Sequence, residues 1–197
     1  DLPAQLVQKL GNTVVPVYVR FGNEAYRDGV DISHDEFYQQ IEKGPIHPTT
    51  SQPTPGDFSD AYSKLSTEAD EIVSIHLSSK TSGTYNSALQ GRELAKTKCP
   101  IEVIDSVSVS MGLGLIAMAA ARLAKAGENL QAVIEEIRQA IPGIRMLGVF
   151  DTLKYLLLGG RVSKAKAIAG GVLNVKPLIT MRDGEVVQAG LARNRCK

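Results

Sequence analysis

The stretch Glu71–Lys96, EIVSIHLSSKTSGTYNSALQGRELAK, contains the transition that decides the fold. Its first seven residues form a nearly continuous apolar run, which predicts a buried strand. A polar turn containing glycine follows over 78–84, and 85–96 has the apolar spacing of a helix. The same order recurs at once, with a short buried strand at 101–104, a polar loop at 105–110 and a small-residue helix at 111–126. Strands that alternate with helices predict an α/β fold built on a parallel sheet.

The residues before this stretch predict a strand and two helices. Residues 14–21 are rich in β-branched and aromatic side chains and indicate a strand that the Gly22-Asn23 turn ends. Ser33 and Glu36 have the spacing of a capping box, in which two side chains cap the start of a helix. The remaining expected elements are that helix over 33–42, a Pro-, Thr- and Ser-rich loop over 45–55 and a second helix over about 57–65.

The residues after it predict a second, smaller domain. An amphipathic helix over 129–140 closes with Pro142-Gly143, which we take as a domain boundary. Two strands at 175–181 and 185–191 are joined through Asp183-Gly184, a pair typical of a β-hairpin turn. The other elements expected here are a strand at 144–150 and helices at 152–158 and 163–172. The sequence thus predicts a three-layer α/β/α domain with a parallel sheet over 1–143 and a smaller mixed-sheet α/β domain over 144–197.

Composition and charge argue against several classes of partner. The 197 residues are 43% hydrophobic and 22% charged, which is typical of a folded globular protein. The net charge of +1 creates no field that would draw in nucleic acid or an anionic membrane. Cys99 and Cys196 lie far apart without metal-ligand spacing, so we expect no metal site and a reducing, cytoplasmic location. The apolar stretch 113–121 is too short to span a bilayer, so no membrane insertion is expected.

Two hydroxyl-rich loops are candidates for binding an anion. Residues 78–84 lie between a strand and a helix, where backbone N–H groups and hydroxyls converge. The segment 49–53 has a similar composition. Two such loops at the carboxyl edge of one sheet would form a shared polar cup, in the place where open α/β sheets bind ligands. The alternative is that these residues only cap helices and form turns.

Two glycine motifs have simple structural interpretations. Gly112-Leu113-Gly114 resembles a dinucleotide fingerprint, but it starts several residues after its strand and lacks the expected acidic partner. Close packing of a helix is the better interpretation. Gly159-Gly160-Arg161 is typical of a helix end followed by a solvated charge.

Motifs for catalysis are lacking. His34, His47 and His76 are isolated, and His76 lies in an apolar strand, where a core or strand-end histidine is more common than a metal ligand. The chain contains no GxSxG, Walker A or HExxH motif, which argues against hydrolase, nucleotide-kinase and protease functions.

Several short motifs, taken in order, make the chain similar to the DegV family. Each is weak alone, but together they cover nearly the whole chain. They are Thr50-Ser51-Gln52-Pro53 with Gly56-Asp57-Phe58, Ile75-His76-Leu77-Ser78-Ser79 with Ser82-Gly83-Thr84-Tyr85-Asn86-Ser87-Ala88, Val103-Ile104-Asp105-Ser106, Ser110-Met111-Gly112, Leu158-Gly159-Gly160-Arg161, and Lys176-Pro177 with Asp183-Gly184. The family pattern opens with a further strand before the Asp1 equivalent and continues past Arg193, so a first strand and a C-terminal part are expected to be lacking.

The resemblance implies a carrier protein that has no catalytic site and no cofactor. Family members bury a long-chain, palmitate-like fatty acid between two domains, and the residues that hold its carboxylate correspond to Thr50 and Ser82. Ser51, His76, Gly83 and Thr84 are expected around the same ligand. Arg161 is similar to an arginine implicated in working with a fatty-acid kinase catalytic subunit, the partner that phosphorylates the bound carboxyl group.

Two alternatives stay open at the level of the sequence. The fold also resembles the substrate-binding half of dihydroxyacetone kinases, which would make the chain a phosphotransfer subunit for a small polar substrate, with His76 as the candidate residue. The second alternative is a scaffold whose polar loops are only caps.

Overall fold

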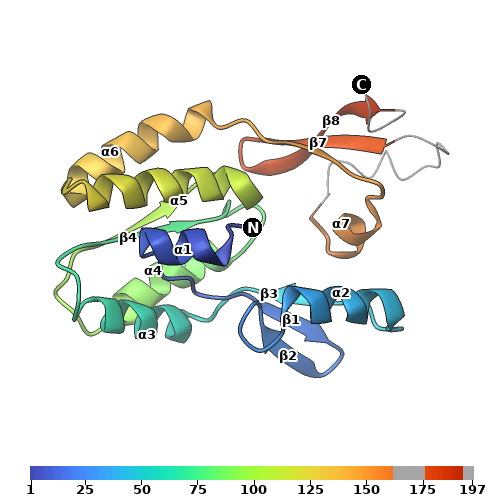
Figure 1. Ribbon diagram of the computed structural model, residues 1–197, viewed down its shortest axis with the longest axis horizontal. Coiled ribbons are helices and arrows are strands. Elements are labelled where there is room, and N and C mark those ends of the chain that lie inside the picture. The colour runs from blue at the N-terminus through green and yellow to red at the C-terminus, as the bar shows by residue number, and fades with distance from the viewer. Residues whose placement is uncertain (162–175, 193–197) are drawn as a thin grey trace. The chain divides into compact units, whose positions relative to one another are not determined.

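The computed structural model describes residues 1–161 and 176–192 (Figure 1). It divides into two compact units. The first unit comprises Asp1–Asn12, Val73–Tyr85 and Glu102–Lys197, and the second comprises Thr13–Ile72 and Asn86–Ile101. The chain therefore passes between the units several times. A domain boundary at residue 143 stays a prediction.

A parallel pair of strands lies at the centre of the first unit. The pair consists of β4 (Ile72–His76) and β5 (Ile101–Asp105), whose ends extend into the second unit. Helices α5 (Ser110–Lys125) and α6 (Leu130–Ala140) lie side by side (Figure 1) and pack against these strands. Each fully buried valine or isoleucine side chain in this core stabilises the fold by about 1.5–3 kcal/mol. The buried core residues are Ile104 from β5, Ile116 and Ala120 from α5, and Val133, Ile134 and Ile137 from α6.

A short helix at the start of the chain packs on α5. Helix α1 (Ala4–Leu10) was not expected from the sequence, because it is short and Leu10 is its one buried residue. The Lys125 Nζ donates a hydrogen bond to the Lys9 carbonyl at 2.6 Å. A Cβ added at Gly114 would lie 3.2 Å from Leu2, and one added at Gly112 would lie 2.1 Å from Ser108 Oγ. The interpretation of these glycines as sites of close helix packing is confirmed.

The C-terminal part of the first unit contains an antiparallel sheet in the order β6-β7-β8. Asp183 and Gly184 join β7 to β8 with φ angles of 51° and 79°, which confirms the predicted hairpin turn. Strand β6 is shorter than the expected 144–150, and the helix expected over 163–172 lies outside the described residues. Leu153, which directly precedes α7, packs against the buried Ile179 of β7 and Val186 of β8. The bounds are η1 (Ile141–Gly143), β6 (Leu147–Val149), α7 (Lys154–Leu158), β7 (Lys176–Arg182) and β8 (Glu185–Ala192).

The second unit contains an antiparallel sheet in the order β2-β1-β3. Strand β1 (Tyr18–Phe21) is the C-terminal half of the expected strand, and Gly22, with a φ of 62°, turns the chain directly into β2 (Glu24–Arg27). The sequence did not predict β2, because its residues are mostly exposed. Strand β3 (Thr49–Ser51) corrects the loop expected over 45–55, because three polar residues pair with β1 at the edge of the sheet.

Three helices complete the second unit. Helix α2 (His34–Lys43) starts with the predicted capping box, in which the Ser33 N–H donates to Glu36 at 2.8 Å. The other two helices are α3 (Pro55–Leu65) and α4 (Thr84–Leu94), of which α4 belongs to this unit from Asn86 on. They approach closely at Gly91, where an added Cβ would lie 2.4 Å from the Phe58 Cβ. Helix α2 packs on a core of Val19, Phe21 and Ile32 through Phe37 and Ile41.

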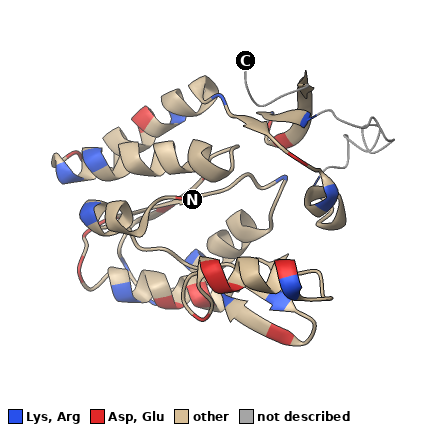
Figure 2. Cartoon of the chain, turned by 45° about the vertical axis from the view of Figure 1, so that its right-hand side comes forward, with Lys and Arg blue, Asp and Glu red and all other residues tan. Residues whose placement is uncertain are grey.

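The α/β class is confirmed, with one parallel strand pair and two antiparallel sheets among the described residues. Figure 2 shows acidic and basic residues interspersed on the helices, as on α2, which carries Asp35, Glu36 and Lys43. Over residues 1–161 and 176–192, no helix has the length and apolar character needed to cross a membrane. The same residues contain no group of three or more His, Cys, Asp or Glu side chains that could hold a metal ion. Cys99 is a free thiol, and Cys196 lies outside the described residues.

Candidate functional site

The polar turn over 78–84 is held in place by Ser78, which is buried. Its N–H donates to the Ser108 carbonyl at 2.8 Å, and its Oγ donates to the Gly184 carbonyl at 2.6 Å. Its own carbonyl accepts hydrogen bonds from the N–H groups of Thr81 and Ser82, at 2.9 and 3.1 Å. Ser78 therefore connects the end of β4 both to the loop after β5 and to the β7–β8 hairpin.

Ser82 and Thr84 form a pair of hydroxyls at the end of this turn. Their oxygens lie 2.8 Å apart, and the Thr84 N–H donates to Ser82 Oγ at 3.2 Å. Two hydroxyls carry two protons, and the bond between them uses one, so the pair retains one O–H donor. Thr84 is buried and Ser82 is half-buried. The pair caps the start of α4 and can also donate to an acceptor such as a carboxylate oxygen. Gly83 lies between the two hydroxyl residues.

Asp105 organises the loops that follow β4 and β5. One carboxylate oxygen accepts from the Val107 N–H at 2.8 Å, and the other accepts from the Ser79 N–H at 3.2 Å. The Ser106 N–H donates to the His76 carbonyl at 2.9 Å. The two loops therefore leave the carboxyl edge of the strand pair as one hydrogen-bonded structure. Asp105 belongs to the Val103-Ile104-Asp105-Ser106 motif, but its role in joining the two loops could not be predicted from the sequence.

His76 is the last residue of β4 and is only 8% exposed. One ring nitrogen, Nε2, lies 2.7 Å from Ser74 Oγ. Burial lowers the pKa of His76 to about 4, and the nearby Asp105 carboxylate only partly opposes this effect. The imidazole is therefore neutral at pH 7 and acts as a hydrogen-bonding group without a charge.

Thr50 and Ser51 lie in β3 and belong to the second unit. They pair across the sheet with Val19 and Tyr18, respectively. The expectation that both hydroxyl-rich segments are loops following strands of one parallel sheet is wrong for this segment, because Thr50 lies inside an antiparallel edge strand. Ser82, Gly83, Thr84 and His76 belong to the first unit, so a polar cup shared with Thr50 stays a prediction.

A cavity of about 310 Å³ in the first unit is lined by Arg161 and by residues of the 78–84 turn. Arg161 is exposed, and its guanidinium donates to the Gly159 carbonyl at the end of α7, as expected for a residue that caps a helix end. It also lines the same cavity as Lys80, which places two cationic side chains beside the turn. The role of Arg161 toward a partner stays a prediction. The lining residues are Lys80, Thr81, Gly159, Gly160, Arg161, Glu185 and Val186.

Comparison with known proteins identifies the family. The model described as "Uncharacterised protein, DegV family" matches residues 1–197. The chain belongs to the DegV family. A DegV domain-containing protein of Caldanaerobacter subterraneus subsp. tengcongensis is 41% identical over 186 residues, covering 94% of this chain and 66% of that protein. One from Deinococcus radiodurans is 37% identical over 198 residues, covering 100% of this chain and 69% of that protein. The chain thus spans about two thirds of the length of these DegV relatives.

Solved structures of DegV proteins share the fold. A fatty-acid-binding DegV family protein from Thermus thermophilus matches with a TM-score of 0.88 and 37% identity, covering 98% of this chain and 69% of that one. DegV from Bacillus subtilis, a fatty acid binding protein, matches with a TM-score of 0.88 and 31% identity over the same shares. A stearic acid-binding protein from Eubacterium ventriosum has a TM-score of 0.86 and 31% identity, covering 99% of this chain and 68% of its own. The resemblance to the DegV family is confirmed.

Proposed function

We propose that this chain is a carrier that binds a long-chain fatty acid in the cytoplasm and holds the carboxylate with hydroxyl groups. The observation that carries the proposal is the Ser82–Thr84 hydroxyl pair, with one O–H left to donate, in a chain whose solved structural neighbours bind fatty acids. The proposed head-group residues are Thr50 and Ser82, with Ser51, His76, Gly83 and Thr84 around them.

The energetics of such a ligand divide between its tail and its head. A sixteen-carbon acid has about fourteen methylenes, and burying each contributes roughly 0.8 kcal/mol, which totals about 11 kcal/mol. Association costs about 4–15 kcal/mol, and removing a carboxylate from water costs several more. The tail therefore supplies the affinity, whereas the hydroxyl donors offset desolvation of the head and fix its orientation.

The second part of the proposal is that a fatty-acid kinase catalytic subunit phosphorylates the bound carboxyl group and contacts Arg161. Arg161 is exposed and lines the same cavity as Lys80 and Thr81, and Thr81 directly precedes Ser82 in the turn. A partner that touches Arg161 would therefore lie beside the turn that carries a proposed head-group residue.

The phosphotransfer alternative has less support. It requires His76 to reach a small polar substrate, but His76 is only 8% exposed and lies within hydrogen-bonding distance of Ser74. A long acyl chain that places only its head near the strand edge needs no open approach to this ring.

The ligand class is tested by mass spectrometry of an organic extract and by calorimetry with palmitate. Ser82→Ala and Thr50→Ala should each weaken binding by about 1–3 kcal/mol, because each removes a hydrogen bond to a charged group. Ser79→Ala is the matched control, since Ser79 is an exposed serine of the same turn that is not among the proposed ligand residues. A chain that carries no fatty acid and takes none up would be a scaffold. Unchanged affinity in both variants would remove the head-group assignment.

The partner assignment is tested with Arg161→Ala. This variant should keep its affinity for palmitate and lose phosphorylation by the kinase subunit. Arg145→Ala is the control, because Arg145 is an exposed arginine elsewhere in the first unit. Loss of palmitate binding in Arg161→Ala would instead place Arg161 in the ligand site.

A further inference from the structure

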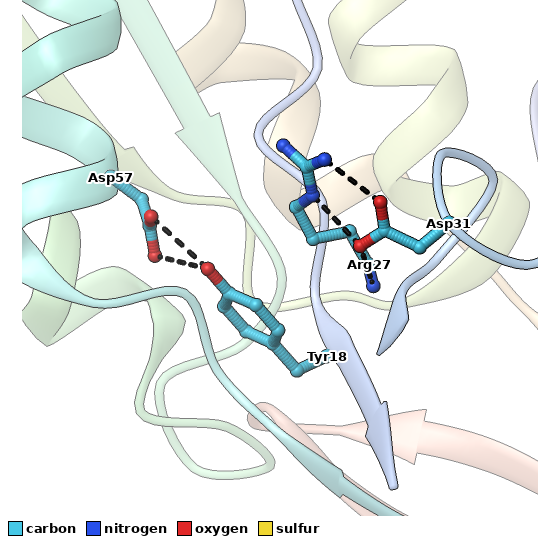
Figure 3. A network of polar contacts seen from close by, with 4 residues as sticks. All are labelled: Tyr18, Arg27, Asp31 and Asp57. Carbon is cyan, nitrogen blue, oxygen red and sulfur yellow. Dashed lines mark hydrogen bonds and ion pairs between the residues drawn. The ribbon is translucent and has the colours of Figure 1, made fainter. Parts of the chain in front are cut away.

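A polar contact in the second unit connects strand β1 to the first turn of α3 (Figure 3). The Tyr18 hydroxyl donates to the Asp57 carboxylate and lies 3.1 Å from both of its oxygens. Burial and the Asp57 carboxylate both raise the pKa of Tyr18, so its hydroxyl stays protonated and remains a donor at neutral pH. The two residues are 39 positions apart in the sequence.

Asp57 is also fixed from its other side. One of its oxygens accepts from the Thr54 N–H at 2.7 Å and from Thr54 Oγ1 at 2.8 Å, and the Asp57 N–H donates back to Thr54 Oγ1 at 3.1 Å. This capping box starts α3. The carboxylate of Asp57 therefore joins Tyr18 to the chain at Thr54.

The segment that contains Thr50 runs between these anchors. Tyr18 pairs with Ser51 in the β1–β3 register, and only Gln52 and Pro53 separate Ser51 from Thr54. Pro53 is fully buried. Tyr18 thus contacts both ends of the connection from Ser51 to Thr54. Its backbone pairs with Ser51, and its hydroxyl reaches Thr54 through Asp57.

Thr50 directly precedes this connection in the chain, so it is joined to it through the backbone. Residues paired across a sheet project from the same face, and neighbours along a strand project from opposite faces. Thr50 therefore shares a face with Val19, whereas Ser51 shares the opposite face with Tyr18. Because the Tyr18 side chain projects from the face opposite to that of Thr50, its contact with Asp57 does not occupy the face from which Thr50 projects.

We infer that Tyr18 and Asp57 are positioning residues, which fix the backbone of β3 so that the Thr50 hydroxyl meets the ligand carboxylate. The inference rests on the proposed function, in which Thr50 holds the head group. Tyr26 offers a direct contrast in the same sheet. Its hydroxyl donates to Glu24 at 2.7 Å, but both residues are in β2, so this bond joins no separate segments.

The test is Tyr18→Phe, which removes the hydroxyl and keeps the ring, with Tyr26→Phe as the matched control. Binding of palmitate and of hexadecanol, each delivered from cyclodextrin, is measured by calorimetry. Tyr18→Phe should weaken palmitate binding by about three- to tenfold, the effect of one lost hydrogen bond. Hexadecanol, which has no carboxylate, should change by less than about twofold. Tyr26→Phe should change neither. In a Thr50→Val background, Tyr18→Phe should cause no further loss.

Three results would overturn the inference: wild-type palmitate affinity in Tyr18→Phe, an equal loss for both ligands, or a full additional loss in the Thr50→Val background. An equal loss would assign Tyr18 to general stability. If Tyr18→Phe does not fold, Asp57→Asn, which keeps an acceptor oxygen, should weaken palmitate binding and leave hexadecanol binding unchanged, and an equal loss for both ligands would again overturn the inference. A wild-type chain that does not bind palmitate refutes the proposed function itself. A chain that binds palmitate but is insensitive to Thr50→Val removes only Thr50 from the head-group residues, and the inference falls in either case.

Discussion

Mild acid should destabilise this protein through His76. Burial lowers the pKa of His76 to about 4 in the folded chain, against an ordinary value of 6.5. Between these values the unfolded chain binds a proton that the folded chain does not, so the free energy of unfolding falls as the pH decreases from 6.5 to about 4. Above pH 6.5 both states have a neutral ring and the effect is absent. The difference of about 2.5 in pKa corresponds to roughly 3 kcal/mol.

The assay is urea unfolding of the wild type and of His76→Gln at a series of pH values from 7.5 to 4.5. This range isolates His76 from depressed carboxyl groups such as Asp31, whose pKa falls from 3.8 to about 2 and which therefore act at lower pH. The readout is the slope of stability against pH, which should flatten in His76→Gln. His34→Gln is the control, because it makes the same substitution at an exposed histidine. Equal slopes in the wild type and His76→Gln, or an imidazole pKa of 6 or more by NMR, would refute the reasoning.

Three further substitutions test the packing that supports the candidate site, each by urea unfolding. Gly91→Ala should cost about 1–3 kcal/mol, because the new Cβ would lie 2.4 Å from Phe58, whereas Gly143→Ala, with nothing within 4 Å, should cost less. Gly184→Ala should cost more than Gly29→Ala, because both have positive φ but only a Cβ added at Gly184 would meet Ser78 Oγ, at 2.5 Å; equal costs would show that Ser78 moves aside freely. Ser33→Ala should cost about 1 kcal/mol through loss of the α2 cap, and an unchanged midpoint would contradict the capping box.

The elements that could be predicted from the sequence are those whose cause is local. Ser33 and Glu36 form their capping box within one helical turn, and the hairpin turn at Asp183-Gly184 depends on the backbone of two adjacent residues. The edge strands β2 and β3 were missed for the opposite reason. Their residues are mostly exposed and polar, so no hydrophobic alternation marks them, and only pairing with β1 makes them strands.

The candidate site also has parts that could be predicted from the sequence and parts that could not. The Ser78–Thr84 turn could be predicted, because a polar turn between a buried strand and a helix can be recognised in the sequence. The bonds that hold it could not, since Ser79 meets Asp105 across 26 positions and Ser78 meets Gly184 across 106. The same limit applies to Tyr18 and Asp57. Motifs therefore identify the residues that could meet a ligand, whereas the residues that fix their positions emerge only from the folded chain.

In the proposed function the bound carboxylate has to react, and the chemical types of the proposed head-group residues suit that reaction. A cation paired with a carboxylate would stabilise its charge strongly and reduce its tendency to attack a phosphoryl group. In the proposed function, hydroxyls such as those of Ser82 and Thr84 would orient the carboxylate with weaker bonds, and a neutral His76 would add no positive charge. The cations Lys80 and Arg161 line the neighbouring cavity together with Glu185, so two positive charges face one negative charge there, and in the proposed function they would favour an incoming phosphate. In the proposed function, the head is thus held by neutral groups while positive charge lies beside it on the side of the partner.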